Sequence, residues 1–306
     1  MSVDGEQHEG RHDLQELRAQ LKATSDRVEE KAGRNLFLAI GSGLVFGAVF
    51  LGSLFWMKPA FAILVGALVV IALVELASAF RTAGRRVPRF GVALGGLLTV
   101  SATYFWGAAG MLMGLFAASA LLIVWRLLEG LVPKWEVAPK TLVRDVFSGL
   151  FTLVYVGFFG SFAILLNELD NGEWWVFTLV LVVVSVDIGA YAAGVTLGKH
   201  KMTPRISPNK TWEGFAGAAI LAMTTGVLSA VFFLDQPWWV GILLGVVVLL
   251  TATGGDLTES LIKRDLGVKD MSTWFPGHGG FLDRLDSLLP SAVAVYGVAL
   301  VVGVIS

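Results

Sequence analysis

Apolar runs of about 20 residues recur along the chain, and they constrain its fold more than any other feature. A run of this length crosses roughly 30 Å of hydrocarbon as an α-helix. Charged residues make up only 15% of the chain, against about 25% in a typical soluble domain. The sequence therefore predicts an all-α, polytopic integral membrane protein. About nine spans are expected, near residues 35–56, 60–80, 90–107, 109–125, 146–167, 174–197, 213–234, 238–257 and 286–305.

Lysine and arginine are distributed unevenly between the loops that join these spans. Only Lys58 falls in one set of loops, whereas the N-terminal tail holds six such residues and each long loop of the other set holds four. Because Lys and Arg are enriched on the cytoplasmic side of membranes, this pattern predicts a cytoplasmic N-terminus and an outer C-terminus. The four long loops expected in the cytoplasm are residues 81–89, 126–144, 198–212 and 258–285.

The same pattern gives the expected domain organisation. Residues 1–34 form a polar cytoplasmic tail, and residues 35–306 form the transmembrane domain. The chain has no cysteine, which excludes disulfides and thiolate chemistry. We expect a multi-pass protein of the plasma membrane.

A few carboxylates fall inside or at the ends of the predicted spans. Asp187 lies in the middle of one span, and Asp256 ends another. Asp283 and Asp286 are three residues apart at the start of the last span, so both point to the same side of a helix. An ionisable residue at membrane depth is by default a candidate for a functional site, because burying its charge is costly. These four residues are therefore candidate ligands or catalytic groups.

Other interpretations of these carboxylates remain open. A helix cap would explain one carboxylate in the first turn of the last span, but it would explain neither Asp187 nor Asp256. A transporter would also need carboxylates inside the membrane, as proton or cation sites. Glu75 lies near the cytoplasmic end of a span without polar neighbours in the sequence, which favours a structural interpretation for that residue.

Three cytoplasmic segments place cationic and small polar residues next to these carboxylates. The segments are "TPRISPNKTWEG" at 203–214, "SLIKRDLGVKD" at 260–270 and "PGHGG" at 276–280. Carboxylates bind Mg²⁺ through oxygen, and Mg²⁺ typically bridges them to substrate phosphates. Nearby cations would hold the remaining phosphate oxygens. The residues therefore indicate metal-assisted phosphoryl or nucleotidyl transfer between a soluble polyanion and a lipid, at the cytoplasmic surface.

The stretch "SLIKRDLGVKDMSTWFPGHGGFLDRLD", residues 260–286, resembles the signature of the phosphatidate cytidylyltransferases, or CDP-diacylglycerol synthases. The upstream "ISPNKTWEGF" and "GDLTES" are similar to further blocks of that family. The resemblance covers about residues 185–290, which we take as the catalytic region. The fixed positions of the signature are filled by Ser260, Lys263, Arg264, Lys269, Asp270, His278, Gly279, Gly280, Asp283, Arg284 and Asp286.

This resemblance implies the reaction of CTP with phosphatidate to give CDP-diacylglycerol and diphosphate. It implies Mg²⁺ as cofactor together with a second cation such as K⁺. The partners implied are CTP, phosphatidate and the lipid bilayer; a homodimer is a further expectation, and no nucleic-acid partner is expected. A related CTP-dependent lipid kinase remains an alternative.

The resemblance also assigns roles to residues. It implies Lys263, Asp283 and Asp256 as catalytic residues, and Asp256, Asp283 and Asp286 as metal ligands with Asp187 as a further candidate. His278 would orient a phosphate or an aspartate, because a phosphomonoester is already a competent nucleophile near neutral pH. The implied substrate-binding residues are Ser207, Asn209, Lys210, Lys263, Arg264, His278, Gly279, Gly280 and Arg284.

Overall fold

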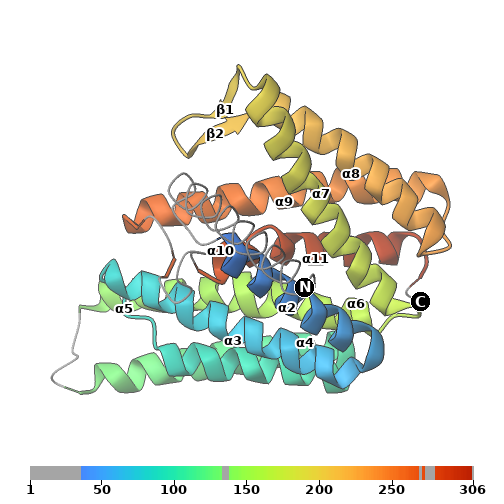
Figure 1. Ribbon diagram of the computed structural model, residues 1–306. Helices are drawn as coiled ribbons and strands as arrows, with labels where there is room; N and C mark the ends of the chain where they lie inside the picture. The colour runs from blue at the N-terminus through green and yellow to red at the C-terminus, as the bar shows by residue number, and fades with distance from the viewer. Residues whose placement is uncertain (1–35, 133–137, 269–270, 273–279, 305–306) are drawn as a thin grey trace, which may run out of the picture. The chain divides into compact units, whose positions relative to one another are not determined.

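The computed structural model describes residues 36–132, 138–268, 271–272 and 280–304 (Figure 1). The chain divides into two compact units, one of residues 1–51 with 276–278 and one of residues 52–275 with 279–306. Helix α2 (Leu36–Trp56) begins in the first unit and ends in the second. The predicted tail, residues 1–34, lies outside the described residues. The elements that carry the candidate site all belong to the second unit.

Helices form nearly all of the described structure. Seven helical stretches of the described chain are long and apolar enough to cross a membrane. This agrees with the predicted all-α, polytopic membrane architecture. After α2 the helices are α3 (Lys58–Thr82), α4 (Arg89–Gly130), α5 (Pro139–Thr152), the π-helical η2 (Leu153–Phe158), α6 (Phe159–Asn167), α7 (Gly172–Leu197), α8 (Trp212–Phe232), α9 (Trp238–Leu266), α10 (Leu282–Leu285) and α11 (Leu288–Val301).

Helix α4 reverses its direction at Gly107. The backbone there has φ 59° and ψ −144°, which lies outside the helical region and suits a residue without a Cβ. The residues before and after this point pack closely, since a Cβ on Gly114 would lie 2.7 Å from the Cα of Thr99. The two arms of α4 therefore run antiparallel, and they correspond to the spans predicted at 90–107 and 109–125.

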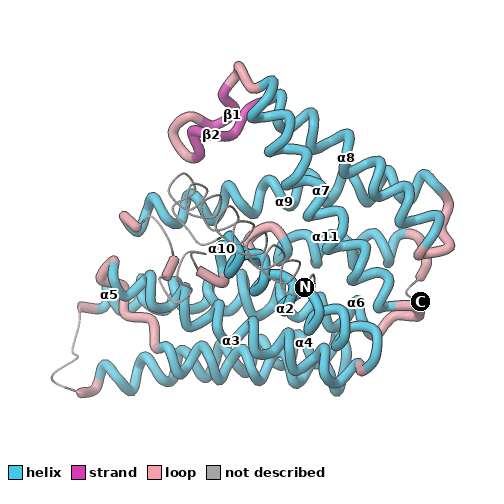
Figure 2. Tube along the Cα trace, in the orientation of Figure 1, coloured by secondary structure: helices cyan, strands magenta, loops and turns pink. Residues whose placement is uncertain are grey.

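A short β-hairpin between α7 and α8 departs from the helical pattern (Figure 2). Its strands β1 (Lys201–Thr203) and β2 (Ser207–Thr211) pair antiparallel, with Lys201 opposite Thr211 and Thr203 opposite Ser207. Thr211 also caps α8, because its hydroxyl accepts a hydrogen bond from the N–H of Gly214 at 3.1 Å. The sequence predicts a loop here. In the structure two short polar strands pair instead, and Ser207, Asn209 and Lys210 all lie on β2.

The base of the hairpin is tied to the start of α8 by Glu213. Its carboxylate accepts the main-chain N–H groups of Lys199 and His200, at 3.1 and 3.2 Å. The Nδ1 atom of His200 lies 2.6 Å from the same carboxylate. These bonds satisfy the free N–H groups where α7 has ended, and they hold the hairpin against α8.

Small residues bring the backbones of α7, α8 and α9 close together. A Cβ on Gly189 of α7 would lie 2.7 Å from the carbonyl oxygen of Gly217 on α8. A Cβ on Gly245 of α9 would lie 2.7 Å from the Cα of Met223 on α8. Such close approach is typical of helix packing within membranes. It brings residues of α7 and α9 to one cavity together with the hairpin.

Candidate active site

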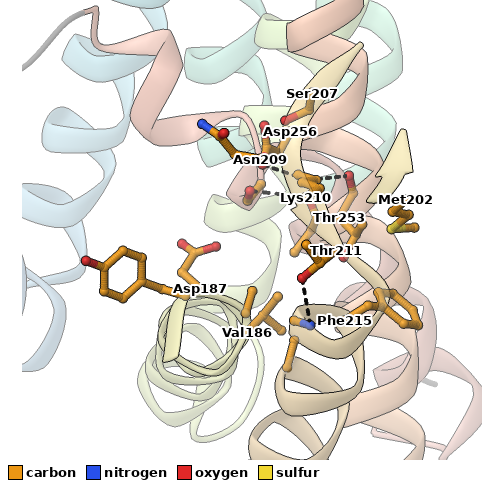
Figure 3. A pocket seen from close by; sticks show the side chains of 16 residues that line it. Val186, Asp187, Met202, Ser207, Asn209, Lys210, Thr211, Phe215, Thr253 and Asp256 are labelled. Carbon is orange, nitrogen blue, oxygen red and sulfur yellow. Dashed lines mark hydrogen bonds and ion pairs between the residues drawn. The ribbon is translucent and has the colours of Figure 1, made fainter. Parts of the chain in front are cut away.

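A cavity of about 300 Å³ lies between α7, the β-hairpin, the start of α8 and α9 (Figure 3). Helix α7 and the hairpin supply opposite walls, and Ser287, at the start of α11, also lines it. The sequence separates these elements by up to about a hundred residues, and the close packing of α7, α8 and α9 brings them together. Five of the predicted site residues line this cavity: Asp187, Ser207, Asn209, Lys210 and Asp256.

Lys210 and Asp256 form an ion pair across this cavity. The Nζ atom of Lys210 lies 2.7 Å from Oδ2 of Asp256, and it also approaches the carbonyl oxygen of Thr253 at 3.5 Å. The carboxylate of Asp187 rises from α7 on the other side of the cavity (Figure 3). The ammonium group of Lys210 is therefore held by Asp256 at the cavity, where an incoming polyphosphate would compete with Asp256 for it.

A second group of charged residues lies on α9 and α10. Lys263 on α9 donates to Oδ1 of Asp283 at 2.7 Å, and its Nζ lies 3.5 Å from Glu259. The Glu259 side chain is buried and lies beside the carboxyl groups of Asp283 and Asp286. A single lysine thus faces three neighbouring carboxylates. Glu259 lies three residues after Asp256 and four before Lys263 on α9, so helix geometry places all three on one face.

Asp286 lies between the cavity and this group. Its Oδ1 accepts the N–H of Ser287 at 2.6 Å, and the hydroxyl of Ser287 donates to the carbonyl oxygen of Ala252 at 3.3 Å. The backbones also approach each other closely, because a Cβ on Gly255 would overlap the carbonyl oxygen of Asp286. The turn between α10 and α11 is therefore held directly against the part of α9 that carries Asp256.

Glu75, which has no polar neighbours in the sequence, has polar partners that are remote in the sequence. Glu75 is buried on α3, and its carboxylate accepts hydrogen bonds from the N–H groups of Leu282 at 2.7 Å and Phe281 at 3.1 Å. It also accepts the hydroxyl of Ser272. Two free N–H groups at the start of α10 are satisfied in this way, as a capping residue would satisfy them. Glu75 thus fixes the segment that presents Asp283.

Gly280 is required by this arrangement. Its N–H donates to Oδ2 of Asp283 at 2.8 Å. A Cβ at position 280 would lie 2.6 Å from the carboxylate of Glu75 and 3.0 Å from that of Asp283. Only glycine fits between the two acids.

Among the described predicted residues, Arg264 and Arg284 do not line the cavity. Arg264 is exposed, because successive residues of a helix point about 100° apart and its neighbour Lys263 takes the inward direction. Arg284 is also exposed, within electrostatic range of Asp187. Lys269, Asp270, His278 and Gly279 lie outside the described residues.

The predicted metal ligands supply suitable donors, although their side chains do not converge. Within the described parts of the chain, no three His, Asp or Glu side chains are arranged to hold a metal ion. The ammonium group of Lys210 contacts one oxygen of Asp256, and that of Lys263 contacts one oxygen of Asp283. The buried Oε1 atom of Glu259, however, has no hydrogen-bond donor among the described residues. A buried carboxyl oxygen without a donor is suited to a hard cation, so the site has the chemistry for one once the lysines turn away.

Comparison with known proteins agrees with this chemistry. Residues 38–302 match the model of the cytidylyltransferase family. The chain belongs to the cytidylyltransferase family. A phosphatidate cytidylyltransferase of Mycobacterium bovis is 40% identical over 271 residues, which cover 87% of this chain and 89% of that protein. A phosphatidate cytidylyltransferase of Mycobacterium leprae is 40% identical over 280 residues, which cover 89% of this chain and 90% of that protein.

A more distant relative matches a smaller part of the chain. The phosphatidate cytidylyltransferase of Bacillus subtilis is 42% identical over 159 residues, covering 48% of this chain and 58% of that protein. The resemblance carried by residues 260–286 is thus confirmed at the level of the family. The chain is an enzyme of the nucleotidyltransferase class.

Proposed function

We propose that this chain transfers the cytidylyl group of CTP to phosphatidate, giving CDP-diacylglycerol and diphosphate for phospholipid biosynthesis. A phosphate oxygen of phosphatidate attacks the α-phosphorus of CTP and forms the new P–O bond. The bond from the α-phosphorus to the oxygen that bridges to the β-phosphorus breaks, and diphosphate leaves with that electron pair. The relatives named phosphatidate cytidylyltransferase, similar over most of their length, support this substrate pair.

The observation that carries the proposal is the pairing of two lysines with two aspartates. Lys210 with Asp256 and Lys263 with Asp283 form two adjacent ion pairs, both at 2.7 Å. Each pair offers a cation for phosphate and a carboxylate for a metal ion. When a triphosphate binds, the lysines transfer to its oxygens, and the carboxylates are left to bind cations. Ser207 and Asn209 line the same cavity and donate further hydrogen bonds to phosphate or nucleotide.

We assign Mg²⁺ to Asp256, Asp283, Asp286 and Asp187, with a second cation such as K⁺ beside it. When bound, Mg²⁺ neutralises the phosphate charge and stabilises the leaving diphosphate. The residues around the carboxylates contribute by holding the parts of the site in position. Glu75 holds the start of α10, Gly280 allows the two acids to approach, and Ser287 ties the next turn to α9. This arrangement fixes the carboxylates before substrate arrives, which is the condition for efficient transition-state stabilisation.

The topology proposed with this function has nine crossings, with the N-terminus in the cytoplasm and the C-terminus outside. The count treats the two antiparallel arms of α4 separately and includes α2. The distribution of lysine and arginine supports this orientation. Under it, the site faces the cytoplasm of the plasma membrane, where CTP is available, and phosphatidate arrives from the bilayer. A homodimer remains part of the proposal.

The direct test uses purified protein with phosphatidate, Mg²⁺ and CTP labelled with ³²P at the α-phosphate. Label in the lipid phase, with release of unlabelled diphosphate and loss of transfer in EDTA, is the expected result. A lipid kinase would instead leave the label in soluble CDP, and a transporter would leave CTP intact. Either outcome, from protein with a cooperative thermal transition, contradicts the proposal.

A further inference from the structure

A second cavity, of about 720 Å³, lies apart from the candidate active site. It is bounded by the end of α3, the turn that follows it, α5 and the end of α9. None of the residues that line it lines the first cavity. Its lining combines the two arginines Arg85 and Arg144 with the apolar side chains of Phe80, Phe147, Phe151 and Leu261.

Positive charge exceeds negative charge around this cavity. Among the described residues of 81–89 and 126–145, six arginines and one lysine stand against two carboxylates, which leaves five positive charges uncompensated. Loop charge of this kind predicts only the orientation of the chain in a membrane. Orientation does not require that two of these arginines, Arg85 and Arg144, line a cavity. The cations are Arg81, Arg85, Arg86, Arg89, Arg126, Lys140 and Arg144, and the carboxylates are Glu129 and Asp145.

A buried ion pair holds the arginine-bearing turn in place. Arg126 and Asp145 are 0% and 1% exposed, and their side chains are 2.9 Å apart. Asp145 also accepts the main-chain N–H of Arg86 at 3.1 Å. Arg144 donates to the carbonyl oxygen of Gly84 at 2.9 Å, next to Arg85. A buried ion pair is weak evidence for stability. Here, however, these contacts attach the turn at 84–86 to α5, and they keep the guanidinium groups of Arg85 and Arg144 beside the cavity.

The lining has two chemically distinct parts. Arg85 lies with its guanidinium carbon 5.5 Å from the ring centroid of Phe80. Its ion pair with Asp265 at 2.5 Å is solvated, since the Asp265 side chain is 63% exposed, and such pairs contribute little. Phe147, Phe151 and Leu261 are exposed apolar residues on membrane-length helices. A ligand that suits this cavity therefore has an anionic group at one end and a hydrocarbon part at the other.

We propose that this cavity binds an anionic phospholipid of the membrane. Arg85 and Arg144 hold its phosphate, and its acyl chains lie against Phe147, Phe151 and Leu261. A guanidinium group matches a phosphate with two parallel hydrogen bonds, and basic pockets between transmembrane helices on the cytoplasmic side suit anionic headgroups. The bound phosphate displaces Asp265 from Arg85. A soluble nucleotide or free phosphate would leave the apolar walls uncovered, so the lipid fits the whole lining.

The test measures lipid binding to the purified full-length protein by native mass spectrometry, without CTP. Phosphatidylglycerol and phosphatidylcholine of equal chain length serve as probes, since the first is anionic and the second carries no net charge. We expect phosphatidylglycerol to bind at least fivefold more tightly, and Arg85→Gln with Arg144→Gln to remove this preference. Arg89→Gln is the matched control, because it removes a charge from the same loop without altering the lining.

The variant Asp265→Asn tests whether the Arg85–Asp265 ion pair competes with lipid binding or has a structural role alone. If Asp265 competes with the phosphate, the variant binds phosphatidylglycerol more tightly than the wild type, by about twofold or more. Equal binding of both lipids, an equal effect of Arg89→Gln, or weaker binding in Asp265→Asn would overturn the proposal. So would displacement of phosphatidylglycerol by millimolar glycerol 3-phosphate or CTP, because that would assign the site to a soluble anion. Because catalysis is not measured, the result is independent of the function proposed for the first cavity.

Discussion

The carboxylate of Glu75 accepts the main-chain N–H of Leu282 at 2.7 Å and so joins α3 to the residue before Asp283. The two residues are 207 positions apart in the chain. A second N–H, from Phe281, and the hydroxyl of Ser272 complete its bonding. The N-terminal half of the chain thereby contributes to the position of a candidate catalytic aspartate, although its own residues carry no recognisable motif.

Replacing Glu75 by Gln should lower kcat/KM by about 10–100-fold, as is typical when a group that supports a metal ligand is lost. The amide keeps the size of the side chain but turns an N–H₂ group toward N–H donors, so the start of α10 loosens. Hydrogen exchange at residues 280–283 should rise in parallel. Ser78→Ala is the control on the same helix, because within the described residues its hydroxyl bonds to the carbonyl oxygen of Val74 alone. A lower melting temperature with unchanged kcat in Glu75→Gln would leave Glu75 with a structural role only.

The sequence could predict where the helices lie, but it could not predict the contacts between distant residues of the site. Hydropathy located the helices, because each span must be apolar along its length whatever it packs against. The short polar strands of the hairpin lack that signal, and Pro204 and Pro208 within "TPRISPNK" favoured a loop. The partners of Glu75 could not be foreseen, because two of them are main-chain N–H groups that any sequence would offer. Such contacts depend on tertiary packing, which local pattern does not encode.

Asp256→Asn should reduce turnover by about 10²–10³-fold, the loss typical for a group that stabilises transition-state charge. Its effect on folding should be small, since Asp256 is 42% exposed and its partner Lys210 also reaches solvent. Turnover measured alongside the melting temperature tests both parts. Thr258→Ala, on the same helix, should leave both unchanged, because its hydroxyl makes a single bond in the described part of the chain, to the carbonyl oxygen of Gly254. Wild-type turnover in Asp256→Asn would remove this residue from the site.

Asp283 requires a different test, because its carboxylate is also part of the local structure. It accepts the ammonium group of Lys263 and the N–H groups of Gly280 and Met271. Asp283→Ala would leave these donors without a partner, at a cost of about 1–3 kcal/mol of stability each where they are buried. Asp283→Asn retains one carbonyl oxygen and most of the volume. We expect it to fold with a modestly lower melting temperature and to lose nearly all turnover. Substantial turnover in this variant, at any Mg²⁺ concentration, would contradict the assignment.

Two adjacent glycines on α9 offer a matched pair for testing the approach of α9 to the turn before α11. A Cβ on Gly255 would overlap the carbonyl oxygen of Asp286 and lie 2.8 Å from Pro290, whereas a Cβ on Gly254 would meet no atom within 4 Å. Gly254→Ala should therefore raise the free energy of unfolding by about 0.5–1 kcal/mol, the usual gain in a helix interior. Gly255→Ala should lower it and also reduce turnover, because it moves Asp286 away from Asp256. Melting temperature and turnover of both variants, measured in the same detergent, test whether this close approach helps to form the site. Equal behaviour of the two variants would mean that this close approach has no role in forming the site.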